Sequence, residues 1–291
     1  MRIFVAVARL ESLSSAAKAL KVDPATVGRR IARLETDLGG ALFAKSPQGY
    51  ALTDLGQRVQ THAEQAEGAM ALAREEAQGS EGRLTGQIRI GAPDGSANFL
   101  LPQVCAEISR ENPELEIQIL ALPRVVNLSK READMAVTVS PPVAGRMSVQ
   151  KIADYRLHVA ASVEYLNSAP PIRNVADLRD HPIVGYIPDM IFDKELDYLN
   201  EMGVERVALA SNSVSVQLNM LRQGAGVGVA HDFAMPLVGG LQKVLADEVS
   251  LTRSFYLVRH ASDARVERLS RFAQRLVTGL RAEVAKLEAL A

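Results

Sequence analysis

The sequence predicts an α/β protein that begins with a winged helix-turn-helix, continues through a long helix and ends in a larger α/β body. Three observations predict this class. A capped helix that carries arginines begins at Pro24, an alanine-rich heptad pattern runs over 54–79, and strand and helix patterns alternate from Gln87 onward. Strands that alternate with helices favour a largely parallel sheet.

Length and charge bound the kind of protein. A chain of 291 residues is long enough for two or three domains. No apolar run approaches the ~20 residues of a membrane span. Residues 1–58 carry nine Lys and Arg against five Asp and Glu, a balance of +4, whereas the whole chain has a net charge of −1, which leaves −5 for the remainder. A basic head on an acidic body fits a protein whose N-terminal part touches nucleic acid.

The N-terminus and the cysteine content indicate the compartment. The apolar segment 3–7 is followed at once by Arg9 and Glu11, so we expect no secretory leader. The single cysteine, Cys105, excludes a disulfide within the chain and favours a reducing, cytoplasmic setting. Because Cys105 lies in an apolar helical pattern, we expect a buried structural thiol.

Three short helices are predicted in the first forty residues. The first covers 3–10, the second is capped by Ser12 or Ser14 and reaches Leu20, and the third runs from Pro24 to about residue 37, where Gly39 and Gly40 stop it. Asp23 is a suitable N-cap, and Pro24 suits the first helical position because its missing N–H costs nothing there.

The third helix has two different faces. Val27, Ile31 and Leu34 form one apolar stripe. The other face is small and then basic, and it consists of Ala25, Thr26, Arg29, Arg30 and Arg33. Such a helix suits the major groove of DNA, where side chains read base edges and cations meet phosphates. On a helix outside this setting the same arginines would be only a solvated face.

The segment 42–53 has apolar ends around a Ser-Pro-Gln-Gly turn, which predicts a small hairpin, or wing. Lys45, Ser46 and Gln48 at its tip are expected to reach phosphates or the minor groove.

In the long helix over 54–79, the heptad seam is Leu55, Val59, His62, Ala66, Ala69, Ala73 and Ala77. A seam this narrow favours pairing with a second copy of the helix. The segment 79–82 predicts a break between domains.

The body predicts eight strands and four helices. The strands are 87–91, 116–120, 135–139, 155–160, 183–186, 207–209, 227–229 and 255–258, and the helices are 98–109, 127–132, 213–222 and 266–287.

Along most of its length the sequence resembles the LysR-type transcriptional regulators of bacteria. In the head the matching residues are Phe4–Val7, Ser12, Ala16, Ala17, Leu20, Val27, Arg29, Ile31, Leu34, Glu35, Leu38, Gly39, Leu42, Phe43, Gly49, Leu52, Thr53 and Gly56. In the body they are Gly86–Gly91, Leu101, Pro102, Asp134–Ala136 and Gly224–Val229. Two departures stand out. Only three residues precede Phe4, and Pro24 and Gly28 replace the polar residue and the serine that are usual in the third helix, so contacts of those two family positions do not carry over.

The resemblance implies a DNA-binding domain at 1–58, a linker and dimerisation helix at 59–83, and an effector domain at 84–291. The effector domain would consist of two Rossmann-like lobes similar to periplasmic solute-binding proteins, with subdomain I at 84–154 and 260–291 and subdomain II at 155–259. A small effector would bind between the lobes. The resemblance also implies a homodimer or homotetramer on an interrupted inverted repeat of double-stranded DNA, and contact with RNA polymerase if the protein activates transcription.

Candidate effector residues lie where strands end and helices begin, because ligands of open α/β sheets bind there. They are Asp94 and Ser96, Thr138, Ser211, Asn212 and Ser213, and His231. The competing interpretation is that the serines only cap helices. Asp94 would repel a carboxylate. His231 and Asp232 follow a Gly-rich strand, where they would either orient a ligand or hold a local turn.

Two other classes of protein compete with a regulator. An enzyme is disfavoured because the five histidines lack metal-ligand spacing and no G-x-S-x-G elbow or P-loop is present. The Gly-rich segment 224–228 precedes a strand, whereas a dinucleotide fingerprint precedes a helix. We therefore expect no catalytic residues, no metal and no cofactor. A solute-binding protein without a DNA-directed role would suit the body alone, but not the winged head. The expected mechanism is allosteric: effector binding changes the angle of the lobes and thereby the spacing of the heads on DNA.

Overall fold

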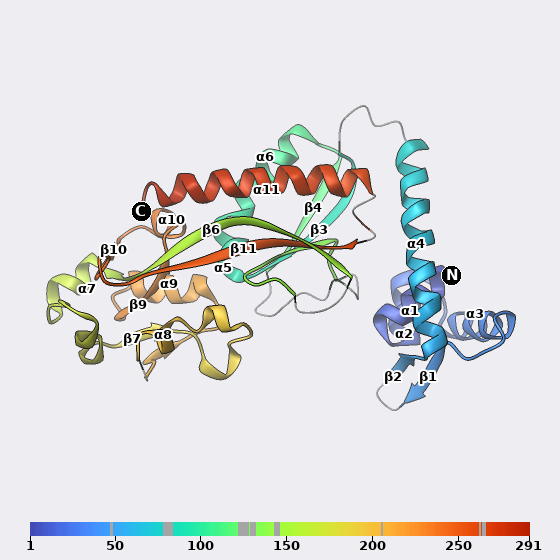
Figure 1. The fold of residues 1–291 in the computed structure, drawn as a ribbon, viewed down its shortest axis with the longest axis horizontal. Helices are drawn as coiled ribbons and strands as arrows, with labels where there is room; N and C mark the ends of the chain where they lie inside the picture. The colour runs from blue at the N-terminus through green and yellow to red at the C-terminus, as the bar shows by residue number, and fades with distance from the viewer. Residues whose placement is uncertain are drawn as a thin grey trace.

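The computed structural model describes residues 1–46, 49–77, 84–121, 128, 132–142, 146–204, 206–261, 263 and 266–291. The chain begins with three short helices, a hairpin and a long helix, as the sequence predicts (Figure 1). These elements are α1 (Arg2–Leu10), α2 (Leu13–Leu20), α3 (Pro24–Asp37), β1 (Phe43–Ser46), β2 (Gly49–Leu52) and α4 (Asp54–Ala77).

Capping side chains set the starts of α2 and α3. The Ser12 hydroxyl accepts a hydrogen bond from the backbone N–H of Ser15 at 3.3 Å, so Ser12 is the cap of α2. The Asp23 carboxylate accepts from the N–H of Ala25 at 3.1 Å, and Pro24 occupies the first turn of α3. Each cap satisfies an amide that the helix itself leaves free. The turn between the two helices is therefore fixed by local chemistry.

The head has an apolar core of its own. Its buried residues are Phe4, Val5, Val7, Ala8, Ala16, Ala17, Val27, Ile31, Leu42, Phe43 and Ala63. Gly56, at the start of α4, lies against the backbone that leads into β1: a Cβ there would be 2.1 Å from the carbonyl oxygen of Leu42. This close contact holds α4 against the head.

The first turns of α4 pack on the head instead of forming a free seam. Leu55 and Val59 contact the head core, and Ala63 is buried in it. His62 and Ala66, which the heptad pattern places on the seam, are exposed. At Leu55 and Val59 the predicted seam is therefore used within the chain, whereas its pairing with a second copy beyond them stays a prediction. An ion pair between Arg9 and Glu67 also links α1 to α4.

The body is a mixed α/β structure. Its strands are β3 (Gly86–Ala92), β4 (Leu115–Ala121), β5 (Met135–Thr138), β6 (Met147–Ser162), β7 (Ile183–Gly185), β8 (Leu209–Ala210), β9 (Val227–His231), β10 (Leu241–Lys243) and β11 (Ser250–His260). Its α-helices are α5 (Asp94–Phe99), α6 (Leu101–Glu111), α7 (Val163–Ser168), α8 (Tyr198–Glu201), α9 (Val214–Arg222), α10 (Met235–Val238) and α11 (Glu267–Glu288). Short 3₁₀ turns are η2 (Val175–Asp180), η3 (Pro188–Met190) and η4 (Lys194–Leu196).

The strands form one sheet in the order β4-β3-β5-β11-β6-β9-β7-β8, with β10 also paired to β6. Parallel pairs of strands lie toward both edges of the sheet: β3 pairs with β4 and β5, and β7 pairs with β8 and β9. The strands between them, β11 and β6, run antiparallel to each other and to their neighbours. The expectation of a largely parallel sheet therefore holds for the flanks and is wrong for the centre.

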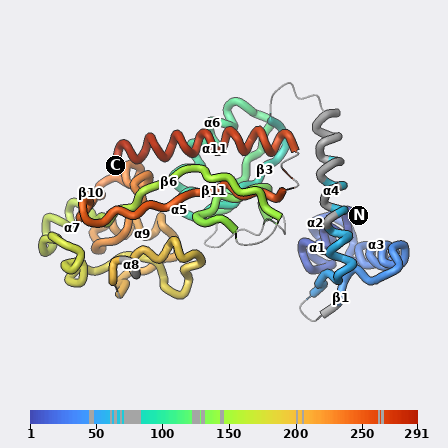
Figure 2. Tube along the Cα trace, in the orientation of Figure 1, coloured from blue at the N-terminus to red at the C-terminus, as the bar shows by residue number. Residues whose placement is uncertain are grey.

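The two long central strands, β6 and β11, lie side by side in Figures 1 and 2. Their register shifts between Phe255 and Tyr256, because Ile152 is an extra residue in β6. This β-bulge leaves backbone groups without ladder partners. Arg281 of α11 supplies the missing donors: its Nε bonds to the carbonyl of Ile152 at 2.5 Å and its Nη2 bonds to that of Lys151 at 2.9 Å. The C-terminal helix is thus attached to the sheet at the bulge.

The predicted helix over 98–109 is wrong at its start. The structure has two helices there, α5 and α6, with a break at Leu100. Pro102 lies in the first turn of α6. Because proline has no N–H and clashes with a preceding helical turn, one continuous helix is excluded. Asp94, expected in a loop, is the first residue of α5, which follows Pro93.

Other boundaries differ because pairing across the sheet extends or shortens strands beyond their local pattern. β6 begins at Met147 and β11 at Ser250, and the expected strand 207–209 is β8 at Leu209–Ala210. The predicted break at 79–82 and most of the helix over 127–132 lie outside the described residues. Among the helices of the described part of the chain, none is both long enough and apolar enough to span a membrane.

Candidate functional site

Helix α3 presents the predicted basic face. Ala25, Arg29, Arg30 and Arg33 are exposed, and Thr26 is half-buried. On the opposite side Val27 and Ile31 are buried in the head core. Nη2 of Arg29 donates to the Thr26 hydroxyl at 3.2 Å, so these two side chains lie together on one turn. The face is therefore continuous and accessible along the helix.

Gly28 lies between these residues. A Cβ at this position would contact only the Leu13 side chain, at 3.8 Å, an ordinary van der Waals distance. The departure from serine is therefore not forced by lack of space.

The hairpin next to α3 pairs Phe43 with Leu52 and Ser46 with Gly49. Lys45 and Ser46 belong to β1, and Gln48 lies outside the described residues.

Asp94 and Ser213 come together although they are far apart in the sequence. Oδ2 of Asp94 accepts from the Ser213 hydroxyl at 3.0 Å and from both the N–H and the hydroxyl of Ser215, at 2.9 and 3.1 Å. Oδ1 accepts from the Asn98 amide at 3.0 Å. The carboxylate thus occupies the N-terminus of α9, where free amides favour negative charge.

The remaining serines have mainly local partners. Ser213 also caps α9 by accepting from the N–H of Val216 at 3.3 Å. Ser96 is buried inside α5 and donates to the carbonyl of Pro93 at 3.1 Å. Ser211 is buried and accepts from the N–H of Ser213 at 3.1 Å. Asn212 is half-buried beside them. Ser213 therefore caps a helix, as the competing interpretation expected. Ser96 does not, because α5 begins two residues before it.

His231 ends β9 in a buried aromatic group. Its ring stacks on Tyr155 with centroids 5.6 Å apart and lies 5.1 Å from Phe233. Burial lowers the pKa of His231 to about 4, an effect that the nearby carboxylates of Asp232 and Asp94 only partly offset. Its Nδ1 has no hydrogen-bond partner in the described part of the protein. The imidazole is therefore neutral at ordinary pH.

Asp232, in the turn directly after β9, has different partners from its neighbour. Its buried carboxylate contacts Nδ1 of His158 at 2.8 Å and Nζ of Lys243 at 2.9 Å. Sequence reasoning missed this network, for which no local signal exists.

The turn after β9 is held by backbone bonds from the N–H of Ala234 to the His231 carbonyl at 2.9 Å and from the N–H of Met235 to the Asp232 carbonyl at 3.2 Å, so these two residues do hold a local turn. That they orient a ligand stays a prediction.

A cavity of about 350 Å³ lies at the carboxyl ends of β3 and β5. Its lining residues are Ala92, Pro93, Leu128, Ala136–Pro142, Met147, Phe192, Asp193 and Val258. The chain passes from β3 to β4 on one side and then to β5 on the other side of β3, so the cavity lies at a topological switch point of the sheet. Of the predicted effector residues, Thr138 lines this cavity.

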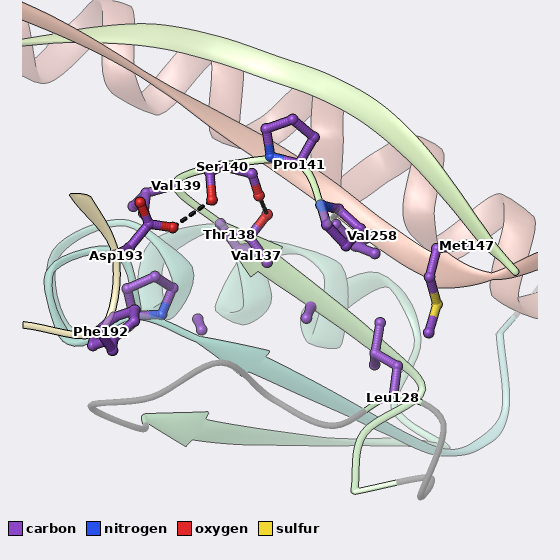
Figure 3. Close-up of a pocket in the computed structure, with 14 residues that line it drawn as sticks. Leu128, Val137, Thr138, Val139, Ser140, Pro141, Met147, Phe192, Asp193 and Val258 are labelled. Atoms are coloured by element: carbon purple, nitrogen blue, oxygen red, sulfur yellow. Dashed lines mark hydrogen bonds between the residues drawn. The ribbon is translucent and has the colours of Figure 1, made fainter. Parts of the chain in front are cut away.

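One end of the cavity is polar and the other apolar (Figure 3). The Thr138 hydroxyl donates to the carbonyl of Ser140 at 2.7 Å, and the Ser140 hydroxyl donates to the carboxylate of Asp193. Leu128, Met147 and Val258 lie toward the other end. Ser140 and Asp193 were not predicted; a polar residue two positions beyond Thr138 is the only local signal for the first.

The structure also shows the surroundings of the single cysteine and of the side chains that could bind a metal. Cys105 is buried in α6, and burial raises its pKa to about 12, so it is a protonated structural thiol. Within the described residues, no group of three or more His, Cys, Asp or Glu side chains has an arrangement that would hold a metal ion.

Comparisons with known proteins agree with these features. The family pattern described as bacterial regulatory helix-turn-helix protein, lysR family, matches residues 1–57, and the LysR substrate binding domain matches residues 81–281. The regulator PtxR of Pseudomonas aeruginosa is 27% identical over 79% of this chain and 75% of its own. The activator TtdR of Escherichia coli K12 is 25% identical over 78% of this chain and 74% of its own.

Solved structures share the fold. A full-length variant of OxyR from Pseudomonas aeruginosa has a TM-score of 0.70 at 20% identity and covers 96% of this chain and 93% of its own. CrgA from Neisseria meningitidis has a TM-score of 0.61 at 23% identity and covers 96% of this chain and 97% of its own. A winged helix-turn-helix joined to a ligand-binding α/β body defines a DNA-binding transcriptional regulator under effector control. The chain belongs to the LysR family of these regulators.

Proposed function

We propose that α3 reads the operator through Thr26, Arg29, Arg30 and Arg33, with Ala25 allowing close approach of its first turn. The observation that carries this proposal is the exposed basic face of a helix whose start is fixed by Asp23 and Pro24. Arginine side chains contribute about 1–3 kcal/mol of discrimination for each good base pairing. Lys45, Ser46 and Gln48 of the wing supply additional contacts to phosphates or the minor groove.

The test uses DNA taken from next to the protein's own gene in a gel-shift titration. Arg29→Ala and Arg30→Ala are expected to abolish specific binding while sedimentation shows an unchanged oligomeric state. Arg222→Ala, an exposed arginine of α9, is the matched control and should bind like the wild type. Wild-type affinity in both α3 variants would exclude this face as the reading surface.

The cavity at the ends of β3 and β5 is the effector site in this proposal, with Thr138 as its predicted contact. Subdomain I would consist of 84–154 and 260–291, and subdomain II of 155–259, joined by β6 and β11. The other predicted effector residues would act next to the effector, at the contact between the two subdomains. They are Asp94, Ser96, Ser211, Asn212, Ser213 and His231. The effector shifts the balance between two arrangements only through its different affinity for each.

The assembly follows from the same proposal. The part of α4 beyond the head would pair with a second copy, giving a homodimer or homotetramer on an interrupted inverted repeat. The protein would act in the cytoplasm, without a catalytic role or cofactor, and would contact RNA polymerase if it activates transcription.

A further inference from the structure

The hydrogen bonds at the polar end of the cavity determine which groups of a ligand can bind there. Both side-chain hydroxyl protons are already used, since Thr138 donates to the Ser140 carbonyl and Ser140 donates to Asp193. Oδ1 of Asp193 accepts from the N–H of Glu195 at 3.0 Å. What remains on these three side chains is acceptor capacity on oxygen atoms.

The charge at this end is negative. Asp193 forms no ion pair with a described residue, and none of the described residues that line the cavity is Lys, Arg or His. A carboxylate ligand placed here would meet the Asp193 carboxylate, with no cation among the described lining residues to offset the repulsion. A ligand that donates hydrogen bonds, and above all a cationic one, would instead gain charge-assisted bonds.

The rest of the cavity selects for an apolar body. Its walls are formed by Leu128, Val137, Met147, Phe192 and Val258 together with alanine and proline side chains. At about 350 Å³ the cavity lies near the lower limit of small-molecule sites, which span ~300–1,000 Å³. A compact molecule with one polar end fits both the size and the lining.

We infer that the effector is a small amine: an apolar, aromatic or branched body with a primary ammonium group directed at Asp193, Ser140 and Thr138. This inference rests on the proposed function, because it takes the cavity as the effector site. It departs from a carboxylate effector, for which the helix N-terminus at α9 would be a natural anion site. In this chain Asp94 already occupies that terminus.

Three probes with the same phenylethyl body separate the chemistry of the head group. Phenethylamine is cationic, 2-phenylethanol is a neutral donor, and 3-phenylpropanoate is anionic. Thermal shift and calorimetry on the full-length protein should show the tightest binding for phenethylamine, weaker binding for the alcohol and none for the carboxylate. Equal or tighter binding of 3-phenylpropanoate, or no binding of phenethylamine at millimolar concentration, overturns the inference.

A charge-removing variant locates the site. Asp193→Asn should weaken phenethylamine binding by at least about tenfold, because it removes the charge from the hydrogen bond to the ammonium group. It should change 2-phenylethanol binding by less than about twofold. Asp189→Asn, an exposed aspartate of η3 four residues earlier, is the control and should leave both affinities unchanged. Equal amine affinity in Asp193→Asn and wild type overturns the inference. The gel shift of each variant is measured without probe, so a failure of the ligand class remains distinguishable from a failure to bind DNA.

Discussion

The carboxylate of Asp94 lies on the N-terminus of α9, where it accepts hydrogen bonds from both the N–H and the hydroxyl of Ser215, 121 residues away. A side chain of α5 therefore provides the negative charge that this helix end favours. The contact connects α5 to α9, which lie in the two different subdomains of the proposed effector domain. An anion that bound at the same place would first have to displace Asp94.

Removal of this contact tests how strongly it holds the body. Asp94→Ala should lower the free energy of unfolding by roughly 1–2 kcal/mol, since it deletes a helix cap. In a double-mutant cycle with Ser213→Ala, the coupling energy should exceed about 0.5 kcal/mol because the two side chains share a hydrogen bond. Denaturant unfolding of the four proteins supplies the measurement, and strictly additive effects would contradict the contact.

Salt dependence distinguishes phosphate contacts from base contacts on α3. For a contact from Arg30 to one phosphate, Arg30→Ala should reduce the slope of log affinity against log salt concentration by about one. A contact to a base instead leaves the slope nearly unchanged and relaxes specificity at one position. Fluorescence anisotropy at several salt concentrations measures both quantities, with Arg222→Ala as the reference.

Replacement of two glycines of the head by alanine should change the free energy of unfolding in opposite directions. Gly28→Ala should raise the free energy of unfolding by about 0.5–1 kcal/mol, because α3 gains helix propensity and Leu13 leaves space for the methyl group. Gly56→Ala should destabilise the head, since its Cβ would lie 2.1 Å from the Leu42 carbonyl. Thermal unfolding followed by circular dichroism checks the pair, and a stabilising Gly56→Ala would contradict the packing described.

The buried His231 predicts a pH dependence of stability. Its pKa is lowered from 6.5 to about 4 in the folded protein, so between these values the unfolded state binds the proton and the folded state does not. The free energy of unfolding should therefore fall as the pH decreases from 6.5 to 4, by up to about 3 kcal/mol from this group. His231→Asn should flatten that part of the profile, whereas His62→Asn, at an exposed site, should not. Identical profiles for His231→Asn and the wild type would contradict a neutral, buried imidazole.

Local chemistry made some features predictable from the sequence. Asp23 and Pro24 define the start of α3 because a cap and a proline act within one helical turn. For α2 the pattern offered Ser12 or Ser14 as the cap, and the structure has Ser12. The start of α3 follows from Asp23 and Pro24 alone, without knowledge of what the helix packs against.

Contacts between distant segments were not predictable in this way. The pattern marked Asp94, Ser213 and His231 as strand-end residues, but their partners depend on how α5, α9 and β9 meet in space. In α4 the head core takes up Leu55 and Val59, which the heptad pattern had assigned to pairing with a second copy. The cavity joins Pro93, Thr138 and Asp193 from three separate segments, and of these residues only Thr138 was expected at the site.

The bulge at Ile152 has a mechanical consequence. Because β6 and β11 remain paired on both sides of it, the sheet can change its twist there without breaking its ladder. Arg281 binds the carbonyls at this point, so such a twist would move the middle of α11 directly. The bulge and the middle of the C-terminal helix would then move together.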